Sequence, residues 1–153
     1  PLRGIFRQVS SHRNLDDRAV TGNPDIAGQE DLHRQAVELL QEDFSRPVEQ
    51  ALARCRQARN VGLSSDDLEA ILRAASIKAV DLLLVAEGED RWGGFDASEG
   101  RLEQHADQQP GDEDLLNLAA IFAHRNGAAV YAVEKEKLPD CPAFATLRFQ
   151  PDA

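Results

Sequence analysis

The apolar positions along the chain predict one central β-strand around which the other elements are arranged. Residues 79–85, A-V-D-L-L-L-V, form an almost unbroken aliphatic run that ends in an acidic stretch containing Gly88. A run this short and this apolar is typical of a strand that is buried on both faces. Such a strand needs helices above and below its sheet, so the pattern predicts a three-layer α/β/α sandwich.

Three segments have the spacing of apolar positions that amphipathic helices show. The first, residues 28–62, is long, and Pro47 inside it predicts a kink or a junction between two helices. The second follows the capping sequence S-S-D-D at residues 64–67 and delivers the chain to the central strand. The third occupies residues 112–126 and ends at Gly127, where a C-terminal stop is expected.

Four further segments predict strands. Residues 91–96 and 101–105 flank a short stretch that ends at Gly100, which is typical of a β-hairpin. Residues 128–133 are aliphatic, and the helix before them predicts a right-handed crossover that places this strand parallel to the central one. Residues 144–149 alternate apolar with small or polar side chains, so we expect a strand nearer the edge of the sheet.

Together these elements predict a chain of three parts. Residues 1–27 show no clear periodicity and are interpreted as a connector or arm. Residues 28–62 form a long, kinked helical extension. Residues 63–153 form the α/β/α sandwich, and we expect its sheet to be mixed.

Charge is distributed unevenly along this chain, whose formal net charge is -10. Residues 1–60 hold nine basic and nine acidic residues, whereas residues 61–153 hold 8 basic and 18 acidic ones. Because Lys and Arg supply most contacts to phosphate, a part this acidic repels a nucleic-acid backbone. The sequence therefore argues against direct, extensive binding of RNA or DNA by the sandwich.

The remaining composition predicts a cytoplasmic protein. Cys55 and Cys141 lie far apart without a C-x-x-C pair, which favours two reduced thiols over the alternative of a disulfide. No apolar run approaches the ~20 residues that span a bilayer, and no signal-peptide pattern is present. The chain begins at Pro1 and contains no Met, so we expect that a longer protein supplies residues upstream.

No pattern in the chain predicts a catalytic residue, a metal site or a cofactor. No G-x-S-x-G nucleophile motif occurs. The histidines are tens of residues apart and form no cluster with metal-ligand spacing. They are His12, His33, His105 and His124.

Acidic residues near the central strand leave one alternative open. Ligands of open α/β sheets bind near the carboxyl ends of strands, so these carboxylates fit a magnesium-assisted nucleotide-binding or hydrolase site. A solvated acidic loop is the favoured interpretation, because no phosphate-binding glycine pattern accompanies them. The residues are Asp81, Glu87, Glu89, Asp90 and Asp96.

The predicted contact site is the stretch R-W-G-G-F-D, residues 91–96, which we expect to present Trp92 in an exposed turn at a loop tip. Trp92 is the only Trp of the chain. It either folds back on the sheet or, beside an Arg, forms a protein-contact hot spot. The predicted contact residues are Arg91, Trp92, Gly93, Gly94, Phe95 and Asp96.

Several stretches resemble the C-terminal domain of the bacterial archaeo-eukaryotic release factor family, relatives of the archaeal and eukaryotic peptide-chain release factor and of Pelota. They are V-D-L-L-L-V-A-E-G, W-G-G-F-D, P-G-D-E-D-L-L-N-L-A-A, N-G-A-A-V-Y-A-V and F-A-T-L-R-F. The earlier stretches F-R-Q-V, G-N-P-D and D-L-H-R-Q-A resemble the connector and long helix of that family.

This resemblance implies an α/β/α sandwich and a partner. In the better-known relatives the terminal domain contacts a translational GTPase and the ribosome, and the peptide-releasing Gly-Gly-Gln belongs to another domain. The present chain contains no Gly-Gly-Gln, so the resemblance implies no catalytic residue here. Its acidic charge favours a protein partner over RNA.

Three hypotheses follow for function. The first is a non-catalytic interaction domain of a translation-termination or ribosome-rescue factor. The second is a metal-assisted nucleotide-binding or hydrolase domain that uses Glu87, Glu89 and Asp96. The third is a dimerisation or scaffold module in which the long helix packs against a copy of itself.

Overall fold

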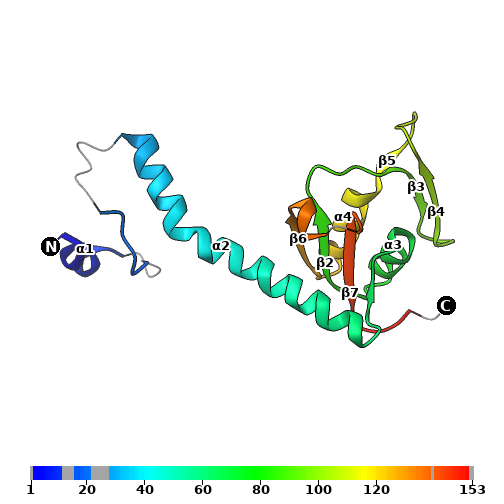
Figure 1. Cartoon of the computed structure of the whole chain (residues 1–153), viewed down its shortest axis with the longest axis horizontal. Coiled ribbons are helices and arrows are strands. Elements are labelled where there is room, and N and C mark those ends of the chain that lie inside the picture. The colour runs from blue at the N-terminus through cyan, green and yellow to red at the C-terminus, as the bar shows by residue number, and fades with distance from the viewer. Residues whose placement is uncertain (1, 12–15, 22–27, 139, 152–153) are drawn as a thin grey trace. The chain divides into compact units, whose positions relative to one another are not determined.

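The computed structural model describes residues 2–11, 16–21, 28–138 and 140–151, and Figure 1 shows the whole chain. The chain forms two compact units, Pro1–Arg46 and Pro47–Ala153. The division falls inside the long helix α2, Gln29–Asn60, which is one uninterrupted helix with Pro47 within it. Residues 28–62 were predicted to form one helical extension, whereas the second half of this helix belongs to the unit that holds the sheet.

The first unit contains the helix α1, Leu2–Val9, and the first half of α2. Residues 1–27 were predicted to be a connector or arm, so α1 was not expected. Ile5, Phe6 and Val9 have helical spacing, but they are exposed and follow no capping residue. Arg18 joins the preceding segment to α2, because its guanidinium donates to the Leu39 carbonyl at 2.6 Å and also pairs with Asp43. The G-N-P-D motif lies outside the described residues.

The second unit is built on a four-stranded mixed sheet, with the order β1-β7-β2-β6. β2 is parallel to β6 and antiparallel to β7, which confirms the predicted parallel pair. β7, which was predicted nearer the edge, lies between β2 and the two-residue edge strand β1. The strands are β1, Ser64–Ser65; β2, Val80–Ala86; β6, Ala129–Val133; and β7, Ala143–Leu147.

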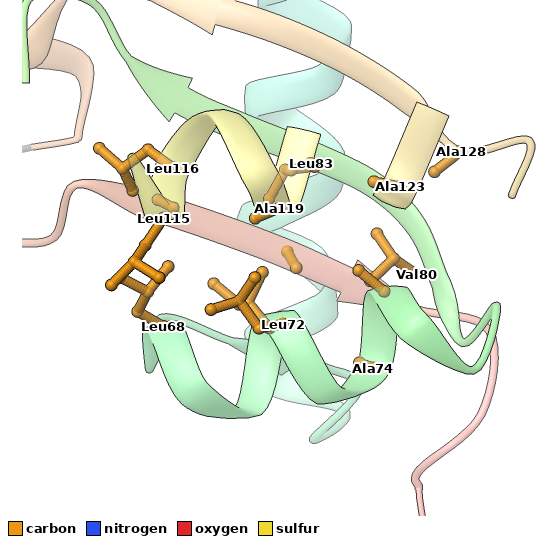
Figure 2. Close-up of a cluster of buried hydrophobic side chains, with 14 of the residues drawn as sticks. Leu68, Leu72, Ala74, Val80, Leu83, Leu115, Leu116, Ala119, Ala123 and Ala128 are labelled. Atoms are coloured by element: carbon orange, nitrogen blue, oxygen red, sulfur yellow. The ribbon is translucent and has the colours of Figure 1, made fainter. Parts of the chain in front are cut away.

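Two helices cover one face of this sheet. They are α3, Leu68–Ser76, and α4, Leu115–Arg125. Leu72 of α3 and Leu115 of α4 are fully buried with Leu83 of β2 between the layers (Figure 2). Each helix begins at a capping Asp, whose carboxylate accepts backbone N–H bonds that the first turn leaves free.

The second half of α2 covers the other face. Ala51 and Cys55 of this helix are buried against Leu82 and Leu84 of β2 and Phe144 of β7. The central strand therefore has packed helices on both sides, and the predicted three-layer α/β/α sandwich is confirmed.

A smaller sheet with the order β4-β3-β5 lies beside α4. β3, Trp92–Asp96, and β4, Arg101–His105, form the predicted hairpin with Trp92 opposite His105. β5, Glu113–Asp114, was interpreted as part of a helix start, because two acidic residues before an apolar run are typical of a cap. A short 3-10 helix, η1, Lys135–Lys137, follows β6.

Arg148 ties together the ends of both covering helices. This residue directly follows β7. Its guanidinium donates to the carbonyl oxygens of Lys78 and Gly127, each at 3.0 Å, and to that of Asn126 at 3.4 Å. Helix C-termini leave carbonyl groups without partners inside the helix, and a cation there also interacts favourably with the helix dipole.

Candidate protein-contact surface

The predicted contact stretch is a strand and not a free loop tip. Residues 92–96 form β3, which has β4 on one side and β5 on the other. Successive side chains of a strand point to opposite faces. The six predicted residues therefore divide into groups with different surroundings.

Phe95 and Gly93 face the interior. The Phe95 ring contacts that of Phe122 on α4 edge to face, with ring centroids 6.3 Å apart. A Cβ at Gly93 would lie 1.9 Å from the carbonyl oxygen of Glu103, so only glycine allows β4 to approach this closely. These two residues shape and anchor the hairpin; Gly93 is buried, and Phe95 is partly exposed.

Trp92, Gly94 and Asp96 alternate with them and lie on the outer face. Their partners on β4 are His105, Glu103 and Arg101. Trp92 is half-buried, and Gly94 is exposed with nothing within 4 Å of the position where a Cβ would lie. We call these three residues of β3 and their three partners on β4 the outer hairpin face. This face carries the Trp92 ring among side chains of both charge signs.

The turn of the hairpin is fixed by hydrogen bonds. The Asp96 carboxylate accepts from the Ser98 hydroxyl at 2.6 Å and from the Ser98 backbone N–H at 2.8 Å. These bonds from Ser98 lower the pKa of Asp96. At the end of the turn, the Gly100 carbonyl accepts from Arg73 of α3 at 2.6 Å, which attaches the hairpin to the main body.

Arg91 joins the two sheets and has little freedom to contact a partner. Its guanidinium pairs with Glu89 at 2.8 Å, and its backbone carbonyl accepts from the Leu115 N–H at 2.7 Å. Lys135, after β6, pairs with the same Glu89. Hydrogen bonds from Lys135 and then Arg91 lower the pKa of Glu89, whose side chain is only 15% exposed.

His105, at the end of β4, forms a charged pair with Asp112. The imidazole Nδ1 lies 3.0 Å from both carboxylate oxygens of Asp112, and Nε2 lies 3.5 Å from Glu103. The Asp112 hydrogen bond raises the pKa of His105. Burial opposes ionisation of Asp112, but bonds from the Gln109 N–H and from His105 outweigh it and lower the pKa of Asp112.

The structure does not gather the acidic residues into one site. Asp81 lies near the start of β2, where it pairs with Arg54 and Arg148, whereas Glu87 and Glu89 follow the end of the same strand. Among residues 2–11, 16–21, 28–138 and 140–151, no group of three or more His, Cys, Asp or Glu side chains fits a metal ion. His12 lies outside these residues.

A cavity of about 440 Å³, which was not predicted from the sequence, lies between the second half of α2 and the sheet. Cys55 and Cys141 both line it, and both are free. We call it the α2 cavity. The sequence signal was the Arg-rich segment A-R-C-R-Q-A-R-N, which interrupts an otherwise acidic unit.

A family model and two solved structures match this chain. The model for the bacterial archaeo-eukaryotic release factor family 3 matches residues 2–77. The predicted resemblance to the bacterial archaeo-eukaryotic release factors is confirmed. No curated protein matches the chain.

The first solved structure is the C-terminal domain of peptide chain release factor from Methanosarcina mazei. It matches with 16% identity and a TM-score of 0.62, over 86% of this chain and 98% of that domain. The second is archaeal Pelota, in a model of ribosome-bound Pelota and ABCE1, with 14% identity and a TM-score of 0.55 over 99% of this chain. The present chain spans only 40% of that Pelota chain. These likenesses establish the fold of a release factor C-terminal domain.

Within the described residues, no helix is both long and apolar enough to cross a membrane.

Proposed function

We propose that this chain is a non-catalytic protein-interaction domain of a translation-termination or ribosome-rescue factor. One observation carries the proposal: the match to a release factor C-terminal domain extends over 98% of that domain, so the whole of its sandwich has a counterpart here. The ribosome-bound state of the Pelota match supports the ribosome as a partner; a translational GTPase is the second partner that we propose.

The outer hairpin face is the proposed contact surface. It is held rigid on three sides, because Phe95 packs on α4, Gly100 bonds to Arg73 of α3, and β3 pairs with β5. A preorganised surface loses little conformational entropy on binding. Trp92 supplies a large aromatic ring beside charged groups, which is the composition of interface hot spots.

The charge of the second unit favours a protein partner over RNA. Residues 47–153 hold 11 basic and 19 acidic residues. On the outer hairpin face, Asp96 and Glu103 offset Arg101, so the surface lacks the excess of cations that a phosphate backbone requires.

Co-sedimentation with ribosomes and capture of purified translational GTPases test the proposal. We expect reversible binding by the intact chain, weakened about tenfold or more by Trp92→Ala, as at interface hot spots. Arg101→Glu serves as a second variant, because Arg101 is exposed and its loss leaves the hairpin core intact. Ile121→Ala is the matched control, since it removes an exposed apolar side chain from α4.

Two results would contradict the proposal. One is an absence of binding to both ribosomes and GTPases at high protein concentration. The other is binding that Ile121→Ala weakens as much as Trp92→Ala does, because it would place the contact away from the hairpin. Circular dichroism of each variant confirms that the fold is retained.

A further inference from the structure

The α2 cavity has the size and lining of a small-molecule site. Its volume of about 440 Å³ falls within the range of about 300–1,000 Å³ that is usual for ligand pockets. Its floor is apolar and buried, formed by Leu84, Leu138 and Phe144 from three separate segments. Such a floor binds an apolar group by removing it from water.

The rim of the cavity is cationic on the α2 side. Arg56 and Arg59 lie one helical turn apart on this helix and both line the cavity. Residues 47–60 contain three Arg and one Glu, in contrast to the 8 basic and 18 acidic residues of 61–153. The cations therefore concentrate at one edge of an otherwise acidic unit.

Most hydrogen-bond donors of these two guanidinium groups are unused. Arg56 makes no hydrogen bond or ion pair within the described part of the chain. Arg59 lies over the Phe144 ring at 4.8 Å and pairs with Asp66 at 3.2 Å. Each guanidinium carries five N–H donors in a planar fork that matches a carboxylate.

The opposite rim restricts the charge of a ligand. Glu136 and Asp140 line the cavity there, are exposed, and make no ion pair within the described residues. Lys137 lies beside them but pairs with Glu134 at 3.4 Å. A second negative charge on a ligand would be repelled by these carboxylates, so a monoanion fits better than a dianion.

We propose that the α2 cavity binds a small molecule that carries one carboxylate on an apolar group. The carboxylate accepts bonds from Arg56 and Arg59, and the apolar group covers the floor between Leu84 and Phe144. This inference is independent of the proposed function, because it concerns another face of the sandwich from the outer hairpin face.

The chain contains its own reporter for occupancy. Its only two cysteines, Cys55 and Cys141, both line the cavity. Burial raises the pKa of Cys55 to about 11 and also raises that of Cys141, so both are protonated at neutral pH and react slowly. A ligand in the cavity should slow their labelling further.

Three probes that share a naphthalene ring test the proposal with the intact chain. We expect naphthaleneacetate to bind in calorimetry and to slow labelling of Cys141 by N-ethylmaleimide. The neutral naphthaleneethanol should bind roughly tenfold more weakly, because it lacks the charge-assisted bonds. Naphthyl phosphate, a dianion, should bind no more tightly than naphthaleneacetate.

Three variants locate the site. Arg56→Gln should weaken naphthaleneacetate binding about threefold to tenfold and leave naphthaleneethanol unchanged. Arg125→Gln is the matched control, since Arg125 is an exposed arginine of α4, on the other side of the sheet. Leu52→Trp fills the cavity and should remove binding of all three probes; circular dichroism verifies its fold.

Each of three outcomes would overturn the proposal. The first is a flat calorimetric trace for naphthaleneacetate at millimolar concentration. The second is equal affinity for naphthaleneacetate and naphthaleneethanol, which would remove the carboxylate from the proposal. The third is binding that leaves the labelling rates of both cysteines unchanged, because the bound probe would then lie outside the α2 cavity.

Discussion

The two halves of α2 share the helical spacing of their apolar residues but have different surroundings. Both halves show apolar positions at helical spacing, yet only the second half has buried residues, Ala51 and Cys55. In the first half, Val37 and Phe44 are 46% and 68% exposed. An apolar stripe shows that a helix has a face to cover, but the neighbouring sheet decides which part of it is covered. Matched pairs of identical residues test the same contrast between covered and exposed positions, first in α2 and then elsewhere in the chain.

The largest expected effect separates Ala51 from Ala36. Ala51→Asp places a charge against Leu82 and Leu84, and should destabilise the second unit by about 3 kcal/mol or more. Ala36→Asp, on the half that has no buried residue, should cost only about 0.5 kcal/mol through helix propensity. Urea unfolding measures both. Ala53→Asp is a second control, because Ala53 lies two positions after Ala51 and is exposed. An equal loss of stability in all three variants would mean that the sheet does not cover α2.

The same contrast distinguishes two adjacent glycines of β3. Gly93→Ala should cost about 1–3 kcal/mol, because the new methyl group would overlap the backbone of Glu103 and force the strands apart. Gly94→Ala meets no atom within 4 Å and should change stability by no more than about 0.5 kcal/mol. Fluorescence of Trp92, the only Trp, reports on the hairpin directly. Equal effects of the two variants would show that β3 and β4 are not paired as described.

Two arginines at helix ends give the next largest difference. Arg148→Ala removes donors from the carbonyl groups of Lys78, Asn126 and Gly127, and we expect a loss of about 1–3 kcal/mol. Arg125→Ala, in the last turn of α4, should have a much smaller effect because its side chain is exposed. Thermal unfolding with circular dichroism compares them. If Arg148→Lys were as stable as the parent, the planar fork would have no special role.

The pattern of the sequence predicted the layers of the fold better than the position of any single residue. The run at residues 79–85 was predicted to be a central strand because it is short and almost entirely aliphatic, apart from Asp81. Residues 144–149 were predicted to form a strand nearer the edge because apolar residues alternate with small or polar ones, yet Thr146 is buried and lies on the side of the sheet that α2 covers. That cover comes from a helix about 90 residues earlier, and no local pattern records it.

The candidate site was predicted only in part for a similar reason. The stretch R-W-G-G-F-D was correctly assigned to a hairpin, but its six residues were treated as one surface. Their division into inner and outer residues depends on the register with β4, which the sequence did not specify. The α2 cavity was missed because Cys55 and Cys141 are 86 positions apart, and only the fold brings them to one cavity.

Two histidines provide the smallest expected difference, which concerns pH. The folded chain raises the pKa of His105 above its ordinary value of 6.5 through Asp112. A raised pKa means that the folded state binds the proton more tightly, so this contribution is complete below about pH 6.5 and is lost as pH rises through the folded pKa. Urea midpoints between pH 5 and 9 should therefore fall less steeply in His105→Gln than in the parent.

His124→Gln is the matched control for this pH dependence, since the His124 imidazole is exposed and forms no ion pair within the described part of the chain. Asp112→Asn should flatten the same slope, because it removes the carboxylate that holds the proton on His105. The lowered pKa of Asp112 acts at the other end of the pH range: its contribution is present above about pH 3.8 and is lost as pH falls further. A slope that is the same in the parent and in His105→Gln would show that the pair contributes nothing to folding, and the outer hairpin face would then owe its order to Phe95, the strand pairing and the Arg73–Gly100 hydrogen bond.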